Sequence, residues 1–289
     1  MSLQDKQTFK QILAEYMGKQ YYTSFILQSD IGRNVFVKNG EIIRIEHYNL
    51  PYYLKPYQKH LQQIQHLKWR KNESENLENE VFWSVIWNGY KLYAGGASNI
   101  NGAKVGKWIE LFEHFLEKSQ IFYIGNYQDG IKTGKWISQF QDTSIGGGFY
   151  KENGQKDGRW TEIENYFREY IQIFISCYLI TYGGVYDNGT KVGIWSLNCN
   201  HNHIGGGQYD INGLKTGKWR ELYEYLLENH EIFIEGEYQN GIRGGFFKII
   251  LNNDIIGGGE YNQNGLKIGY WIELAQCFNM QQLLILIYL

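Results

Sequence analysis

A chain of 289 residues is long enough to bury a core in one large domain or two ordinary ones. Its 28 Lys and Arg nearly balance its 30 Asp and Glu, so the net charge of −2 argues against a general attraction to nucleic acid or anionic membrane. The abundance of Tyr (24), Trp (9) and Gly (34), with two prolines, is typical of a turn-rich β protein and excludes a disordered one.

Three features of the sequence predict a cytoplasmic protein. Its cysteines, Cys177, Cys199 and Cys277, are odd in number and far apart, which favours a reducing compartment over a disulfide framework. The N-terminal MSLQDKQTFK lacks the apolar core of a secretory signal. The longest apolar run, LLILIYL at 283–289, is too short to span a bilayer.

The first 80 residues do not repeat, and we expect a small α+β cap over 1–80. Apolar residues at helical spacing predict an amphipathic helix over 9–17, and NVFVKNGEIIRIEHY at 34–48 predicts a hairpin around its Asn-Gly. A second helix is expected over 57–69, followed by a polar linker at 71–80. The cap would cover the first edge of the sheet that follows.

After residue 80 one pattern recurs, and its copies align on an aromatic residue two positions after a glycine. These aromatic residues are Trp108, Trp136, Trp160, Trp195, Trp219, Phe247 and Trp271. The steps between them are 28, 24, 35, 24, 28 and 24 residues, which alternate between long and short. The repeating unit is therefore a pair of copies, spanning 52, 59 and 52 residues.

Each copy predicts a β-hairpin, because an aromatic strand runs into Asn-Gly or Asp-Gly, whose residues tolerate positive φ. In the even copies Gly follows Tyr at +3 and +7, as in Tyr127, Gly130 and Gly134, whereas in the odd copies it follows at +4 and +8. Because Gly134 and Trp136 are two apart, they share a sheet face. We expect that glycine to leave room beside the indole for a neighbouring ring. VFWSVIWNGYKLYAGG at 81–96 predicts a degenerate opening hairpin.

The segments between the hairpins predict strands that run up and down as one meander. ELYEYLL at 221–227 fits either a strand or a short helix. MQQLLILIYL at 280–289 aligns with the next strand, which either closes the sheet or pairs its free edge with another chain. The expected fold is mainly β: tandem antiparallel hairpins in one elongated, twisted meander sheet over 81–289, with seven hairpins plus a C-terminal strand.

Aromatic-x-x-Gly-x-x-x-Gly on tandem hairpins, as in Tyr127-Gly130-Gly134, resembles MORN repeats. The Gly-x-Trp return strand is similar to the MORN variant of bacterial antitoxin-like repeat proteins, and the paired copies with GGGxY resemble a repeat family expanded in protists. The resemblance covers 95–274, although the odd copies carry one extra residue and Phe247 replaces Trp. It implies a non-enzymatic scaffold or adaptor in a larger assembly of the cytoskeleton or a cilium.

We expect the scaffold to bind a protein partner, or a second copy of itself, through its aromatic face and loop edge. The aromatic residues expected there are Tyr127, Trp136, Tyr150, Trp160, Tyr186, Trp195, Tyr209, Trp219, Tyr238 and Trp271. A single-layer sheet leaves one face that needs cover, which is the reason to expect self-association or a partner.

Cations that recur at the hairpin turns suggest an alternative function. If hairpins lie side by side, neighbouring tips are about 10 Å apart and form a basic row. Its members are Lys104, Lys132, Lys156, Lys191, Lys215, Arg243 and Lys267. This basic row could bind anionic lipid in a peripheral membrane adaptor, or could serve to keep each turn solvated.

The candidates for catalysis and metal binding have simpler interpretations. Cys199, His201 and His203 alternate along CNHNH as zinc ligands could, but no fourth ligand or CxxC accompanies them, and a polar loop is the simpler interpretation. Four glutamates recur two residues after the odd tryptophans: Glu110, Glu162, Glu221 and Glu273. Paired carboxylates occur in glycosidases, but recurrence in every odd copy indicates a structural role. We expect no enzyme activity, metal, cofactor, small-molecule substrate or nucleic acid.

Overall fold

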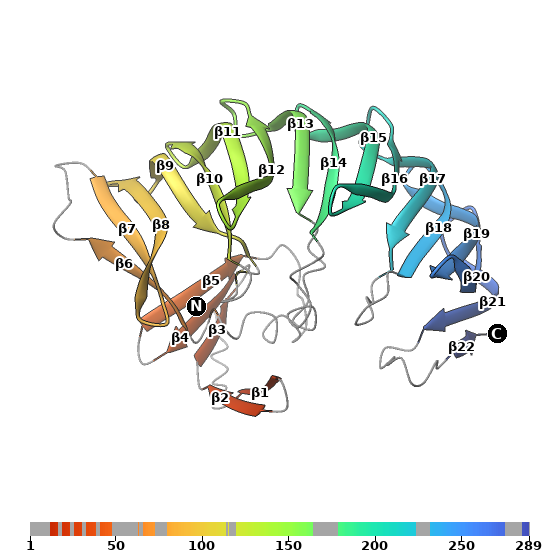
Figure 1. Ribbon diagram of the computed structural model, residues 1–289, viewed down its shortest axis with the longest axis horizontal. Coiled ribbons are helices and arrows are strands. Elements are labelled where there is room, and N and C mark those ends of the chain that lie inside the picture. The colour runs from red at the N-terminus through yellow and green to blue at the C-terminus, as the bar shows by residue number, and fades with distance from the viewer. Residues whose placement is uncertain are drawn as a thin grey trace, which may run out of the picture. The chain divides into compact units, whose positions relative to one another are not determined.

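The structure is a computed structural model of the chain (Figure 1). It describes residues 12–16, 19–23, 26–30, 33–38, 41–47, 63, 66–72, 80–113, 115, 120–163, 179–223, 232–274 and 285–288. Within 12–47 and at 285–288 it describes the backbone alone. Two compact units, 1–123 and 124–289, are treated separately below. Every element with defined bounds in the described residues is a β-strand, which confirms the expected mainly β fold.

The first unit holds three groups of antiparallel strands. Its strands are β1 (Ile12–Tyr16), β2 (Lys19–Thr23), β3 (Ile26–Asp30), β4 (Arg33–Lys38), β5 (Glu41–His47), β6 (Leu67–Asn72), β7 (Glu80–Trp87), β8 (Tyr90–Asn99) and β9 (Lys104–Leu111). The first two form a hairpin, the next three a small sheet, and β6 to β9 a meander. The hairpins predicted within 34–48 and 81–96 are therefore confirmed.

The helix expected over 9–17 was a wrong prediction, because strand β1 occupies its centre. A helix of little more than two turns is marginal in water. The adjacent KQYYT of β2 is a β-favouring partner, and the pair forms a five-residue ladder from Ile12↔Thr23 to Tyr16↔Lys19. The helix expected over 57–69 is borne out at Gln63 and His66, which are helical, but is wrong in its last three residues, which open strand β6 and pair with β7. Most of the rest of 57–69 lies outside the described residues, as does 73–79 of the expected linker.

In the second unit each strand from β11 onward pairs antiparallel with its successor. These strands are β11 (Ile131–Phe140), β12 (Thr143–Tyr150), β13 (Lys156–Ile163), β14 (Ile180–Asp187), β15 (Thr190–Cys199), β16 (Asn202–Tyr209), β17 (Lys215–Leu222), β18 (Ile232–Gln239), β19 (Ile242–Leu251), β20 (Asp254–Tyr261), β21 (Lys267–Leu274) and β22 (Ile285–Tyr288). Strand β10 (Ile121–Gln128) spans the boundary between the units. The C-terminal segment forms the predicted strand, β22, whereas most of 221–227 lies outside the described residues.

Two kinds of turn explain the two spacings of the repeat. In the even copies Asn188 and Gly189 both have positive φ (49° and 84°), which suits a two-residue turn. In the odd copies the loop is longer, and a carboxylate closes it: Asp210 Oδ1 accepts hydrogen bonds from the backbone N–H groups of Asn212 (2.9 Å) and Leu214 (2.8 Å). The extra residue of each odd copy belongs to this loop.

The Gly of Gly-x-Trp has a different role from the expected one. Gly217 has a φ of +66°, and an added β-carbon would meet no atom within 4 Å. It adjoins the irregularity where the β16–β17 register shifts between Gly206 and Gln208, and positive φ is the conformation that favours glycine there. The glycine that faces the indole is instead Gly207 on strand β16, where a β-carbon would fall 2.2 Å from Cδ2 of Trp219.

Candidate functional site

The aromatic residues of the repeats form one continuous row in the second unit. Successive ring centroids lie 4.7–6.1 Å apart, with interplanar angles of 71–90°. The row consists of Tyr127, Trp136, Tyr150, Trp160, Tyr186, Trp195, Tyr209, Trp219, Tyr238, Phe247, Tyr261 and Trp271. Edge-to-face pairs of this kind contribute about 0.5–1.5 kcal/mol each beyond their buried area. We call the row the aromatic ladder.

The tryptophans of the ladder are buried within the chain itself. Their exposed fractions run from 0 to 6%, and each indole N–H donates a hydrogen bond to a backbone carbonyl oxygen. Trp160 Nε1, for example, donates to the carbonyl oxygen of Phe149 at 3.1 Å, and Trp219 Nε1 donates to that of Gln208 at 3.2 Å. The structure therefore brings together all ten aromatic residues expected to bind a partner, but its tryptophans serve the interior. The cover expected from a second molecule is supplied to these rings by the chain.

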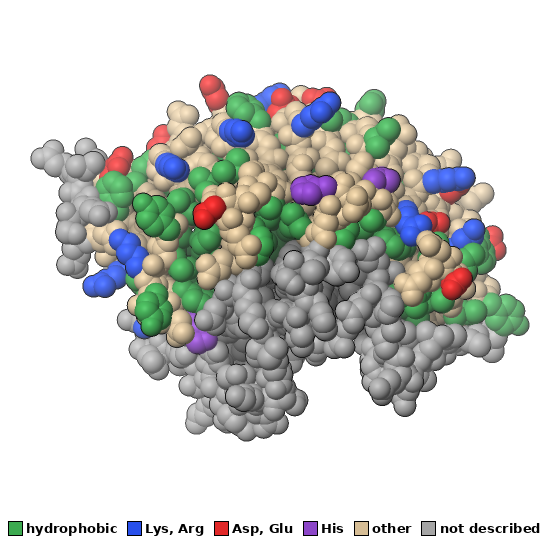
Figure 2. Space-filling view, viewed as in Figure 1, with side chains coloured by type: hydrophobic (Ala, Val, Ile, Leu, Met, Phe, Trp, Pro, Cys, Tyr) green, Lys and Arg blue, Asp and Glu red, His purple; other side chains and the backbone are tan. Residues whose placement is uncertain are grey.

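The basic row does not project from the hairpin tips. Each cation lies over the aromatic ring of its own copy, at 4.0–5.4 Å from the ring centroid. The pairs are Lys104–Trp108, Lys132–Trp136, Lys156–Trp160, Lys191–Trp195, Lys215–Trp219, Arg243–Phe247 and Lys267–Trp271. Figure 2 shows Lys and Arg side chains scattered over the visible face, several of them with Asp or Glu side chains beside them.

The recurring glutamates bind these cations. In each odd copy the Lys pairs with the Glu six residues later: Lys104–Glu110, Lys156–Glu162, Lys215–Glu221 and Lys267–Glu273. Glu162 also binds Lys191 Nζ of the next hairpin at 2.9 Å and accepts a hydrogen bond from Tyr186 Oη at 2.9 Å. A layer of charge pairs thus lies along the ladder.

This layer shifts the titration of its members. Burial by itself raises the pKa of the Glu162 carboxyl, but the ammonium groups of Lys156 and Lys191 outweigh it and hold the pKa below its ordinary value of 4.5. Burial, followed by the neighbouring Glu162 carboxylate, raises the pKa of the Tyr186 hydroxyl above its usual range. The hydroxyl therefore stays protonated and remains a donor to Glu162.

The CNHNH residues diverge in the structure. Cys199 is buried in an apolar cluster that includes Leu197 and Phe233. His201 lies exposed in the turn between β15 and β16, with a φ of 70°, and His203 is exposed on β16. Within the described residues, no group of three or more His, Cys, Asp or Glu could hold a metal ion.

The opposite face of the sheet carries functional candidates that the sequence reasoning missed. Its central positions are the residue before each ladder Tyr and the residue before each ladder Trp or Phe, which pair across strands as in Lys135↔Phe149 and Ile194↔Gln208. We call this surface the outer face: Asn126, Lys135, Phe149, Arg159, Val185, Ile194, Gln208, Lys218, Glu237, Phe246, Glu260 and Tyr270. Several of its apolar side chains are exposed, including Ile194 (75%), Phe246 (62%) and Tyr270 (74%). The available signal was their variation between copies of an otherwise repeated motif.

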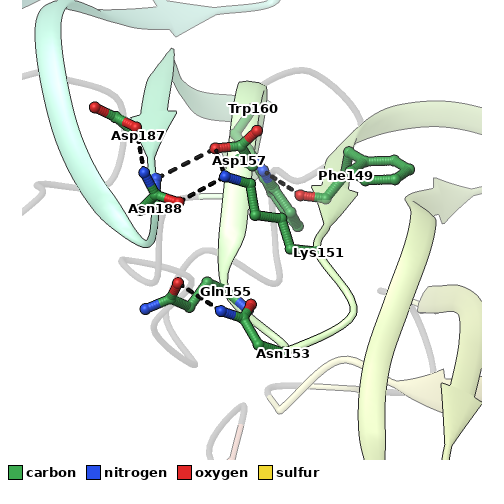
Figure 3. A network of polar contacts seen from close by, with 8 residues as sticks. All are labelled: Phe149, Lys151, Asn153, Gln155, Asp157, Trp160, Asp187 and Asn188. Carbon is green, nitrogen blue, oxygen red and sulfur yellow. Dashed lines mark hydrogen bonds and ion pairs between the residues drawn. The ribbon is translucent and has the colours of Figure 1, made fainter.

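A groove of about 630 Å³ lies on the outer face over β11, β12 and β13. Its floor is formed by Gly146, Gly147 and Gly148, and its walls include Lys135, Phe149, Arg159 and His201. One carboxylate, Asp157, also borders it. Figure 3 shows that this carboxylate is engaged by Lys151 Nζ (3.2 Å) and by the backbone N–H of Asn188 (3.2 Å). The hydrogen bond from Asn188, and then the ammonium of Lys151, lower the pKa of Asp157.

No protein-family model matches the chain, and no curated protein matches it. In the part of the chain that the structure describes, no helix is both long and apolar enough to cross a membrane.

Proposed function

We propose that this protein is a non-enzymatic scaffold that binds other proteins through its outer face. One observation carries the proposal. The aromatic ladder repeats almost unchanged from copy to copy and its tryptophans are buried, whereas the outer face varies between copies and exposes apolar side chains. Large exposed apolar groups on a rigid sheet are typical of interaction surfaces, because they gain free energy when a partner excludes water from them.

The expected membership of the MORN-like repeat families remains part of this proposal. The consecutive hairpins and the Tyr–Trp alternation support it, because they are what the motif requires. An association with the cytoskeleton or a cilium in the cytoplasm, and a partner that is another protein or a second copy of the chain, follow from the same resemblance. Light scattering of the purified chain at micromolar concentration separates the two kinds of partner.

The membrane-adaptor alternative depends on the basic row, and the structure gives it no specific support. Five of the seven cations are ion-paired, to Glu110, Glu162, Glu221 or Glu273, and each of the seven lies over an aromatic ring of its own copy. A cation with a carboxylate beside it contributes little net field to a membrane surface. Salt-sensitive co-sedimentation of the wild-type chain with anionic vesicles would favour the adaptor over the scaffold.

The proposal is tested by altering the outer face without touching the ladder. The variant Ile194→Lys/Phe246→Glu/Tyr270→Asp changes three side chains that are 62–75% exposed, so the fold should be retained, as circular dichroism will check. Ile211→Lys is the matched control, because Ile211 is 87% exposed but lies in a hairpin loop. Proteins captured from a lysate are then quantified by mass spectrometry for all three chains.

We expect a defined set of proteins to be retained by the wild-type chain and by Ile211→Lys, and lost with the triple variant. Retention of the same proteins by the folded triple variant would contradict the assignment of the outer face. Capture of nothing specific by the wild-type chain would contradict the scaffold itself.

A further inference from the structure

The groove over β11 to β13 exists because of what the other face of the sheet requires. Gly148 must lack a side chain to admit the indole of Trp160, and a β-carbon at Gly147 would fall 2.1 Å from the carbonyl oxygen of Trp136. These glycines leave bare backbone on the outer face as well, and the side chains around them become walls. A hollow thus forms on the outer face without any selection for a ligand. The side chains that form the walls can therefore differ from copy to copy.

The walls of this groove are basic. Lys135 and Arg159 flank the exposed ring of Phe149, and His201 lines the same groove. Among the residues that the structure describes, neither Lys135 nor Arg159 has an ion-pair or hydrogen-bond partner, in contrast to the paired cations beside the ladder. The single carboxylate, Asp157, already interacts with Lys151 and Asn188. The groove therefore carries an uncompensated positive charge next to an apolar ring.

The equivalent positions of the other copies show that this charge is particular to one groove. The triad Lys135, Phe149 and Arg159 corresponds to Ile194, Gln208 and Lys218 in the next pair of copies, and to Phe246, Glu260 and Tyr270 in the last. The formal charge of the triad thus runs from +2 to +1 to −1 along the chain. Since the ladder tolerates all three sets, the positive triad is not needed for folding.

We propose that this groove binds a short acidic peptide segment that also carries an apolar side chain. The inference rests on the proposed scaffold function and assigns a partner chemistry to one of its surfaces. Lys135 and Arg159 lie on β11 and β13, about 10 Å apart at the backbone, since each strand spacing is about 4.8 Å. Acidic side chains at alternate positions of an extended segment, about 7 Å apart, lie within reach of both long cations. The ring of Phe149 between the cations receives the apolar side chain.

The test is fluorescence anisotropy with the full chain and a labelled heptapeptide that alternates glutamate with leucine. A matched peptide has glutamine in place of glutamate. The variant Lys135→Ile/Arg159→Tyr installs residues that the chain itself uses at the equivalent positions, Ile194 and Tyr270, so it should fold. Lys218→Tyr makes the same kind of change at the position equivalent to Arg159 in the next pair of copies and serves as the control variant.

We expect saturable binding of the glutamate peptide that weakens as salt is added, and at least tenfold weaker binding of the glutamine peptide. The double variant should lose at least tenfold in affinity, whereas Lys218→Tyr should stay within about twofold of the wild-type chain. The inference would be overturned if the two peptides bound with equal affinity, or if the double variant bound the glutamate peptide as tightly as the wild-type chain does. No saturable binding of the glutamate peptide would overturn it as well.

Two further experiments distinguish peptide binding by the groove from lipid binding and from the scaffold function itself. Vesicles with anionic headgroups that bind the wild-type chain but not the double variant would assign the groove to lipid and overturn the peptide assignment. If the peptide fails while the outer-face triple variant still loses its captured proteins, the inference fails and the scaffold stands. If the captured proteins are also unchanged, both fail.

Discussion

Gly148 lies against the indole of Trp160 on the neighbouring strand, so closely that a β-carbon on Gly148 would fall 2.2 Å from Cδ2 of that ring. The same relationship joins Gly184 to Trp195 and Gly259 to Trp271, at 2.3 and 2.4 Å. Each ladder tryptophan thus lies flat on the backbone of the strand beside it. This contact buries one face of each indole, because the glycine has no side chain to keep the ring away from the backbone.

Two glycine substitutions should separate the two roles of glycine in the repeat. Gly148→Ala forces the Trp160 ring to move, and we expect a loss of about 3 kcal/mol in the free energy of unfolding. The β-carbon that Gly158→Ala adds would meet no atom within 4 Å, but the alanine backbone must adopt a φ of +68°, which should cost about 1 kcal/mol. Urea denaturation followed by tryptophan fluorescence measures both. A larger loss of unfolding free energy for Gly158→Ala than for Gly148→Ala would contradict the assignment of Gly148 as the glycine that contacts the indole.

Trp160→Phe should keep an aromatic ring in the ladder but lose the hydrogen bond that the indole N–H donates. The carbonyl oxygen of Phe149 would lose the indole donor, and the smaller ring would leave part of the glycine surface uncovered, so we expect a loss of about 1–2 kcal/mol. Phe247 shows that a phenyl ring fits the ladder, so the variant should fold. Tyr270→Phe, which alters a 74% exposed side chain, is the control and should change stability by less than about 0.5 kcal/mol.

The charge layer should make stability depend on pH through Glu162. Its pKa is lower in the folded chain than its ordinary value of 4.5, so its stabilising effect is fully present above that value and is lost as the pH falls through the folded pKa. Glu162→Gln removes this dependence and leaves two ammonium groups without their carboxylate. At pH 7 we expect it to be less stable by about 1–2 kcal/mol.

The difference between the wild-type chain and Glu162→Gln should therefore shrink as the pH is lowered below about 4.5. Thermal unfolding in buffers from neutral to strongly acidic pH would measure it. Glu152→Gln, at an exposed loop position, is the control and should follow the wild-type curve. A difference that stays constant with pH would show that Glu162 acts through packing rather than charge.

The loop of the odd copies should depend on its capping carboxylate. Asp210→Ala leaves the backbone N–H groups of Asn212 and Leu214 without their acceptor, and we expect a loss of about 1 kcal/mol. Asn212→Ala changes an exposed side chain in the same loop and should have little effect. Equal stability of the two variants, in the same denaturation experiment, would remove the capping role.

The hairpins could be predicted from the sequence because their signals are local. An Asn-Gly such as Asn188-Gly189 favours its turn through the φ preferences of two adjacent residues. The role of Gly148 could not be predicted in the same way. Its contact with Trp160 depends on the register between β12 and β13, which slips at a bulge. The role of leaving room beside the indole was therefore assigned to the wrong glycine, Gly158, which lies two residues before Trp160 in the sequence.

The direction of the basic side chains was not predicted because these residues were assigned to the turns. Lys156 instead opens strand β13 and lies over Trp160, because residues four apart in an alternating strand share a face. Glu162 lies on that face too, but its second contact, with Lys191, joins two hairpins and could not be predicted from one strand. On the outer face, the variation of Lys135 and Phe149 between copies was visible in the sequence, but the glycine-floored groove beside them needed three strands in register.

Glu162 is shared between Lys156 of its own hairpin and Lys191 of the following one, and this sharing limits how such a gene can lengthen or shorten. Duplicating or deleting a single hairpin would leave an ammonium or a carboxylate beside the rings without its ion-pair partner. Duplicating two hairpins together carries both halves of the shared bond along. A unit of two hairpins therefore keeps this carboxylate with both of its cations, in agreement with the alternation of long and short steps along the sequence.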